Sequence, residues 1–187
     1  MIALLPLIVL GVILVWGIMK YNSLITVKNQ VTNAWKQIDV QLKRRHDLIP
    51  NLVNTVRGYM EFEQDTLRQV IEARNGAAGA KTVAESALKE GELTQALSKL
   101  FALTENYPAL KSDAEVARLM EELTGTENKV SFARQFYNDI TTRFNISIQT
   151  FPGNTIATMF NFQQVELFQV ERAEEREVPV VNLSLKK

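Results

Sequence analysis

The sequence predicts an all-α protein, in which an N-terminal transmembrane helix continues into an antiparallel four-helix bundle with long helices. Three observations support this prediction. Residues 1–19 contain no charged side chain. Glycine and proline number only 8 and 5 in 187 residues, so few positions force a helix to end. Beyond the first segment, apolar residues recur at alternating spacings of three and four, the pattern of helices with one buried face.

The composition limits the classes of function that the protein can have. Apolar residues make up 46% of the chain, which is enough for a hydrophobic core. Lys and Arg total 21 and Asp and Glu total 21, and this balance argues against a general nucleic-acid-binding protein. Cysteine is absent, which excludes disulfides and thiolate metal sites but leaves the cellular compartment open.

Residues 1–20 are predicted to form a membrane anchor. A helix over residues 1–19 extends about 28 Å, close to the thickness of a bilayer core. A cleaved signal peptide is the alternative, but the stretch lacks a positively charged start and a small-residue cleavage site. Lys20 and Lys28 follow the span and no Lys or Arg precedes it. The positive-inside rule therefore predicts an N-terminus outside and a cytoplasmic domain, with a periplasmic or extracellular domain as the alternative.

The first bundle helix is predicted to continue the anchor to about Arg45, because neither glycine nor proline occurs in residues 20–49. A tight reversal is expected next, since Asp47 can cap a new helix and Pro50 fits within its first turn. The alternative is one helix that bends at Pro50. A reversal here would place the basic residues before Asp47 at the distal tip, far from the membrane.

Three further helices are predicted over residues 48–74, 81–106 and 113–149. The third can bend at Gly91, and the fourth opens at a capping box formed by Ser112 and Glu115. Short connections favour neighbours that alternate in direction, so the fourth helix returns to the membrane. The predicted domains are an anchor, a bundle, a Phe-rich amphipathic segment and a flexible charged tail, at residues 1–20, 21–150, 151–170 and 171–187.

The predicted distal tip is one candidate interaction site. Charge runs of this kind usually face solvent or pair locally, here with Glu105 or Asp113. The alternative is a contact with an acidic protein partner or with anionic lipid of an apposed membrane. The candidate tip residues are Lys43, Arg44, Arg45, Asp47 and Tyr107.

The Phe-rich segment is a second candidate site, and two interpretations are open. Its aromatic side chains can close the membrane end of the bundle as core residues. Alternatively, they form a wedge that lies in the bilayer interface. The candidate membrane-interface residues are Phe151, Ile156, Met159, Phe160, Phe162 and Phe168.

The residues needed for catalysis or metal binding are missing from the sequence. A di-metal site in a helical bundle needs Glu-x-x-His twice, but this chain has one histidine, His46, and position 43 is lysine. Zinc would lack enough ligands, and no phosphate-binding loop is present. We therefore expect no enzyme, no metal and no cofactor, and we interpret His46 as a polar turn residue. Polar side chains on the fourth helix are expected to pair between helices: Glu127, Asn128, Arg134 and Asn138.

Three blocks of sequence resemble the LemA family of bacterial membrane proteins. They are AWKQIDVQLKRRHDLIPNLVNTVRGY, ENYPALK and ELTGTENKVSFARQFYNDITTRFNISIQTFPGNTIATMFNF. The resemblance covers residues 21–168 and implies a single-pass protein with its N-terminus outside and an α-helical domain. It supplies no catalytic residues, and it links some relatives to membrane remodelling, including magnetosome formation. Phe62 stands where the resemblance leads us to expect histidine in many relatives, which further argues against an enzyme.

Together these observations predict a membrane-anchored, non-enzymatic scaffold that self-associates and organises or remodels the bacterial inner membrane. Its expected partners are the lipid bilayer and further copies of the same chain in a homo-oligomer, without nucleic acid. The alternative is a membrane-tethered adaptor whose distal tip binds a protease or a signalling protein.

Overall fold

The computed structural model describes residues 4–60 and 62–169, and these residues form helices and no strands. The predicted all-α class is confirmed. The predicted tail at residues 171–187 lies outside the described residues. In chain order the helices are α1 (Leu4–Arg57), α2 (Gln64–Ala78), α3 (Val83–Thr104), α4 (Pro108–Lys111), α5 (Ala114–Gln149) and α6 (Gly153–Met159).

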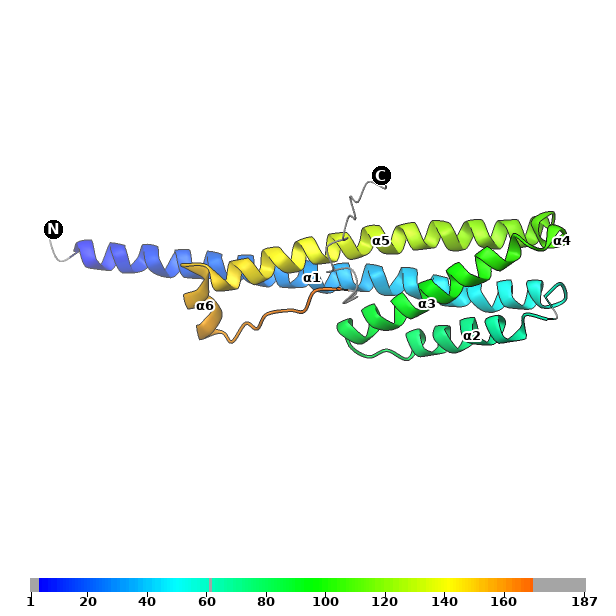
Figure 1. Cartoon of the computed structure of the whole chain (residues 1–187). Helices are drawn as coiled ribbons and strands as arrows, with labels where there is room; N and C mark the ends of the chain where they lie inside the picture. Colours follow the sequence, from blue (N-terminus) through cyan, green and yellow to red (C-terminus); the bar gives the residue numbers. More distant parts are fainter. Residues whose placement is uncertain (1–3, 61, 170–187) are drawn as a thin grey trace, which may run out of the picture.

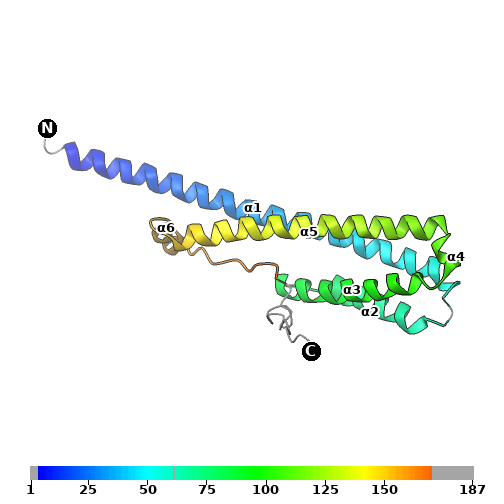
Figure 2. The same cartoon turned by 45° about the horizontal axis from the view of Figure 1, so that its top comes forward.

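The four longer helices alternate in direction along one elongated molecule (Figure 1). Helix α1 has 54 residues and is therefore about 81 Å long. Helices α2 and α3 cover only its C-terminal part, while α5 runs back along α1 for most of its own length (Figure 2). The molecule is thus four helices thick at the distal end, and it continues toward the N-terminus as the pair of α1 and α5.

The predicted reversal at residues 43–47 is wrong, because α1 continues through Pro50 and ends at Arg57. The chain turns toward α2 between Arg57 and Gln64 instead. Pro50 has no N–H, so the carbonyl of His46 lacks its usual helical partner. Arg74 Nε on α2 donates a hydrogen bond to that carbonyl at 3.1 Å. A bond from another helix therefore satisfies the acceptor that the proline leaves free, and the alternative of one continuous helix is the better description.

The fourth predicted helix agrees with α5 to within one residue, but its cap differs. Asp113, rather than Ser112, is the residue before the helix, and its carboxylate accepts the backbone N–H groups of Glu115 and Val116. At the other end, α6 begins at Gly153, where a Cβ would collide with the carbonyl oxygen of Ser147. Only glycine fits at this close approach, so α6 folds tightly against the end of α5.

Two hydrophobic cores fill the molecule. The distal core lies among α1, α2, α3, α4 and α5, and on α1 it begins at Ile49. The proximal core lies mainly between α1, α5, α6 and the chain after α6, and on α1 it ends at Leu42. A polar layer separates these cores, and it contains the side chains discussed below.

The N-terminal part of α1 projects beyond the other helices (Figure 2). Its large aliphatic side chains from Leu7 to Met19 are between 50% and 66% exposed, while Trp16 is half-buried. Helix α1 is the one described helix that is long and apolar enough to cross a membrane, judged by length and composition.

Candidate functional site

A buried charge cluster occupies the polar layer and joins three helices. Arg45 of α1 donates from Nη1 to Glu90 Oε2 of α3 at 2.8 Å. Its Nη2 atom lies 2.8 Å from Thr94 Oγ1 and 2.7 Å from Glu127 Oε2 of α5. His46 Nε2 lies 2.6 Å from Glu90 Oε1. Arg45 and Glu90 are 1% and 0% exposed, so both charges have lost their hydration. The attraction between them offsets part of that cost.

Arg134 of α5 lies beside this cluster. Burial lowers the pKa of its guanidinium, while the nearby carboxylates of Glu127 and Glu90 raise it. The guanidinium also lies over the ring of Phe168, with 4.7 Å between its central carbon and the ring centroid. With Arg45 and Arg134 opposite Glu90 and Glu127, the formal charges of the layer balance.

Four of the predicted tip residues lie within the C-terminal third of α1, before the distal tip. Arg45 is buried, Lys43 and Asp47 are exposed, and Arg44 Nη2 lies 3.8 Å from Glu122 Oε2. Neither Asp113 nor Glu105 is the partner of these arginines, as the tip interpretation had assumed. His46 is a buried helical residue and is not a turn residue.

The sequence did contain a signal for the burial of Arg45. This arginine continues the 4, 3, 4, 3 spacing of the apolar residues on α1, which runs through Ile38, Leu42, Arg45, Ile49 and Leu52. A charged residue that replaces an apolar one inside a buried stripe indicates a buried ion pair. The partner could not be identified in the same way, because Glu90 lies 45 residues further along the chain.

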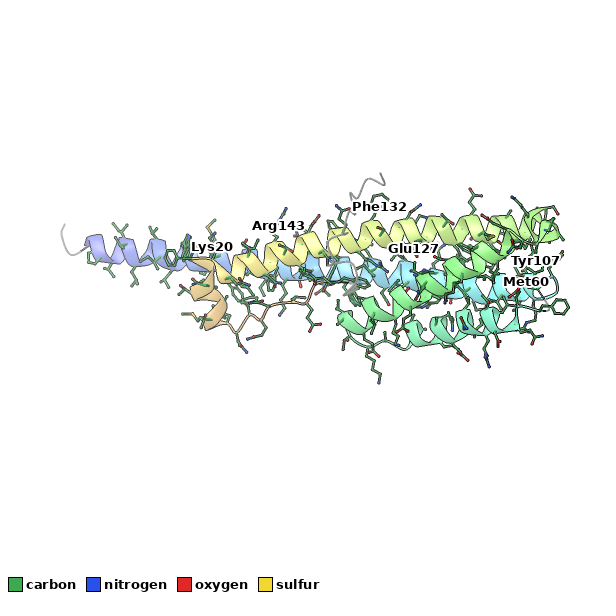
Figure 3. The ribbon with its side chains drawn as sticks, viewed as in Figure 1. Lys20, Met60, Tyr107, Glu127, Phe132 and Arg143 are labelled. Atoms are coloured by element: carbon green, nitrogen blue, oxygen red, sulfur yellow. The ribbon has the colours of Figure 1, made fainter. Side chains whose placement is uncertain are left out.

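The real distal tip is the turn between α1 and α2 together with α4. Tyr107 lies there as predicted, near Met60 (Figure 3), and its hydroxyl is 3.4 Å from Glu63 Oε1. Tyr59 donates to Asp113 Oδ2 at 3.1 Å. Hydrogen bonds from the Val116 backbone and from Tyr59 hold the pKa of the Asp113 carboxyl below its ordinary value. Phe62 protrudes from this tip and is 94% exposed.

Helix α6 lies against α1 where the apolar stretch ends. The rings of Tyr21 and Phe160 pack with centroids 4.5 Å apart. A Cβ placed on Gly17 would lie 4.0 Å from Cδ1 of Ile156. Figure 3 shows α6 at the level of Lys20. The start of the soluble part of α1 and α6 therefore share one level along the molecule.

The six candidate membrane-interface residues divide into two groups. Phe151, Met159 and Phe160 are 84%, 71% and 52% exposed. Ile156 and Phe168 are 9% and 4% exposed, so they belong to the proximal core and are not available to lipid. Phe162 is half-buried, and it packs against the rings of Tyr21 and Phe144.

Two asparagines of α5 hold the extended chain that follows α6. Asn145 Nδ2 donates to the carbonyl of Val165 at 2.8 Å, and its Oδ1 accepts the Val165 N–H at 2.9 Å. Asn138 binds the carbonyl and the N–H of Phe168 in the same way, at 3.0 and 2.8 Å. Tyr137 adds a bond from its hydroxyl to the Glu166 carbonyl at 2.8 Å. Asn138 was expected to pair between helices, but it binds a strand-like segment instead.

A comparison with known protein families identifies the family of this chain. Residues 34–183 match the LemA family, a range that includes the polar layer, all of α5 and α6. The chain belongs to the LemA family. It is 26% identical to the protein LemA of Metamycoplasma hominis, over 87% of this chain and 74% of that protein. It is 24% identical to the magnetosome protein MamQ 2 of Paramagnetospirillum magneticum and 22% identical to the magnetosome protein MamQ of Magnetospirillum gryphiswaldense. Both alignments cover 83% of this chain and 67% of the relative.

Membership of the LemA family and the apolar N-terminal part of α1 together indicate a membrane protein. Within the part of the chain that the structure describes, no group of three or more His, Asp or Glu side chains is arranged to hold a metal ion. The described part of this LemA-family chain displays a cluster of ion pairs around the buried Arg45 and Glu90, and an exposed apolar surface on and beside α6.

Proposed function

We propose that this LemA-family protein is a membrane-anchored, non-enzymatic scaffold that self-associates and organises or remodels the membrane. The observation that carries the proposal is the position of α6. Met159 of α6 and the flanking Phe151 and Phe160 are exposed, and Phe160 packs on Tyr21 beside the end of the apolar stretch of α1. If that stretch spans the bilayer, these side chains lie at the level of the lipid headgroups.

This surface has the properties of an interfacial wedge. Aromatic and aliphatic side chains that enter the boundary between headgroups and acyl chains bind the interface and spread the lipids of one leaflet. The position of α6 is held by the packing of Tyr21 on Phe160 and by the bonds from Asn145 to Val165. A wedge that is held in this way acts on the bilayer rather than folding away from it, and repeated copies would bend the membrane.

The proposal of a non-enzymatic role is supported by the state of the polar layer. The buried carboxylate of Glu90 and the partly exposed carboxylate of Glu127 both face Arg45, and His46 is bound to Glu90. These ion pairs join three helices, as expected of groups that fix helix packing. The two magnetosome relatives agree with a role in membrane organisation, given the link between the family and membrane remodelling.

The proposed location is the inner membrane, with the N-terminus outside and the helical domain in the cytoplasm. It rests on Lys20 and Lys28, which follow the apolar stretch. Because the chain has no cysteine, a single Arg143→Cys variant can be labelled with a membrane-impermeant maleimide. Labelling that requires permeabilised cells supports a cytoplasmic domain, whereas labelling in intact cells supports the external alternative.

The decisive experiment reconstitutes the full chain into vesicles that contain anionic lipid and images their shape. A variant with Phe151, Met159 and Phe160 all changed to serine should insert through α1 but should not deform the vesicles. Phe62→Ser is the matched control, because Phe62 is 94% exposed and lies at the distal tip, at the other end of the molecule from α6. Deformation by the triple variant equal to that by the natural protein would contradict the role of α6.

The adaptor function remains a second candidate because of one observation at the distal tip. Phe62 is an almost fully exposed aromatic residue at the end of the molecule furthest from the apolar stretch. A photoreactive amino acid at position 62 of the full chain would cross-link a docked protease or signalling protein in native membranes. Cross-links that disappear when Tyr107 is changed to alanine would favour the adaptor over the scaffold.

A further inference from the structure

The pair of α1 and α5 has one face that no other described residue covers. A shallow apolar groove runs along this face between the two helices. Val40, Phe132 and Phe136 lie along it and are 62%, 72% and 47% exposed. Figure 3 shows Phe132 on the side of α5 that faces away from α2 and α3. We call this surface the outer face, and it comprises Lys36, Val40 and Lys43 of α1 with Lys129, Phe132, Phe136 and Asp139 of α5.

The two helices of the outer face are held in a defined antiparallel register. The rings of Trp35 and Tyr137 have centroids 5.6 Å apart, and Arg45 Nη2 lies 2.7 Å from Glu127 Oε2. Because the helices are antiparallel, each residue further from the membrane on α1 is level with one residue earlier in the sequence on α5. Val40 and Phe132 lie midway between these two pairs, at the same level along the molecule.

The outer face carries one pair of opposite charges toward its membrane end. Lys36 of α1 and Asp139 of α5 are both exposed. By the register above, Lys36 is level with Phe136, and Asp139 lies three residues further along α5 on the same helix face. Further outward the exposed Lys43 and Lys129 lie at one level, so the opposite charges are confined to the membrane end of the face.

We propose that the outer face binds the outer face of a second copy of this chain in a parallel two-fold pair. This inference rests on the proposed self-association and names its surface. A two-fold axis parallel to the helices brings α1 of each copy opposite α5 of the other at an unchanged level. Val40 then packs against Phe132 of the second copy, and Lys36 comes within about one helical turn of Asp139. The result is a four-helix bundle in which each helix packs against two antiparallel neighbours.

The membrane anchor favours this occupant over an unrelated partner. Copies that are inserted in one membrane are parallel and stand at the same height, which is the arrangement that the two-fold axis requires. Confinement to a surface also raises the effective concentration of one copy near another. Lys36 and Asp139 have opposite charges, so a second copy can pair Lys36 of each chain with Asp139 of the other without any other molecule.

A charge exchange tests the pairing in the full chain. In Lys36→Asp the new aspartate faces Asp139 of a second identical copy, and in Asp139→Lys the new lysine faces Lys36. Each variant alone should associate at least about tenfold more weakly than the natural chain, because like charges are brought together. A mixture of the two variants should regain association, since every contact between unlike copies again joins opposite charges. Energy transfer between labelled copies in vesicles, measured against lipid dilution, reports the association.

A cysteine pair tests the same geometry without changing charge. One tagged chain carries Val40→Cys and a differently tagged chain carries Phe132→Cys, and the natural sequence contains no cysteine that could compete. Mild oxidation in membranes should give a disulfide-linked pair that contains both tags. Val40→Cys with Leu88→Cys is the control, because Leu88 is similarly exposed but lies on α3, and it should give no such pair.

The possible outcomes separate this inference from the proposed function. Recovery by the mixed charge variants, together with the disulfide, supports the pairing. If the natural chain associates but neither charge variant weakens it, the outer face is the wrong surface while self-association stands. A cross-link from Phe132→Cys only to a different protein would show another occupant and overturn the inference. A natural chain that stays monomeric at high density in vesicles would overturn both the inference and the self-association.

Discussion

Arg45 Nη1 lies 2.8 Å from Glu90 Oε2, and the side chains of both residues are almost completely buried, at 2% and 1% exposed. This ion pair lies in the polar layer between the two hydrophobic cores. An apolar interface tolerates small shifts of one helix along another, whereas a buried ion pair is satisfied in one register only. The layer therefore sets how α1 lies against α3 and α5, and through α5 it sets the level at which α6 meets α1.

Glu90→Gln should strongly destabilise the protein. Removal of the carboxylate leaves the buried guanidinium of Arg45 without its main counter-charge, a change that costs about 3–5 kcal/mol in comparable sites. Denaturant unfolding of the full chain in detergent measures the effect. Glu92→Gln is the matched control, since Glu92 lies on the same helix, binds Lys89 at 2.9 Å and is largely exposed. If Glu90→Gln lowered the free energy of unfolding by less than about 1 kcal/mol, water would have access to the polar layer.

Arg74→Ala should destabilise the protein, and Pro50→Ala should reduce that loss. The natural chain relies on Arg74 because Pro50 cannot donate to the His46 carbonyl. A hydrogen bond from a charged donor contributes about 1.5–3 kcal/mol, so Arg74→Ala should cost an amount in that range. In the Pro50→Ala background a helical N–H reaches the same carbonyl. Four unfolding experiments form a double-mutant cycle, and a coupling near zero would contradict the compensating role of Arg74.

Asn138→Ala should release the segment after α6 without unfolding the helices. The variant loses both hydrogen bonds to the backbone of Phe168. Two bonds of about 1 kcal/mol each correspond to roughly 30-fold faster opening, which hydrogen exchange of the Phe168 amide would report. Gln135→Ala changes an exposed amide of the same helix and is the control. Equal exchange rates in the two variants would show that packing of Phe168 alone holds the segment.

Asp113 should make stability depend on pH under acidic conditions. Its folded pKa is lowered from an ordinary value of 3.8, first by the Val116 N–H and then by Tyr59. The ionised form is therefore stabilised by folding, and this contribution is present above about pH 4 and lost as the pH falls through the lowered pKa. Asp113→Asn keeps a capping oxygen but cannot titrate, so its melting temperature should fall less between pH 5 and pH 3. An unchanged acid dependence would assign the effect to other carboxylates.

Much of the molecule can be predicted from local sequence signals. Apolar spacing and helix-breaking glycine and proline residues act on their immediate neighbours. They are enough to predict the uncharged first segment, the alternating directions of the long helices and the extent of α5. The end of α5 follows in the same way, since Pro152 and Gly153 come directly after Phe151. These features depend on residues within one or two helical turns of each other, and such residues are adjacent in the sequence.

The turn at Pro50 could not be predicted locally. Asp47 and Pro50 have the residue types and spacing of a helix start, and a local interpretation places a reversal there. The chain continues as helix because Arg74, from a different helix, satisfies the carbonyl that the proline leaves free. The basic run was misplaced for the same reason, since its position at a tip depended entirely on that reversal.

The sequence by itself determined that this protein is helical, that its first segment is apolar enough for a membrane, and that its family is LemA. The tertiary structure alone decided where the first helix ends, which charges are buried and which phenylalanines face outward. The physical reason is the range of the interactions. Helix periodicity acts over a few residues, whereas the partners of Arg45, the His46 carbonyl and Phe168 lie 28 to 45 residues away in the sequence and become neighbours only after folding.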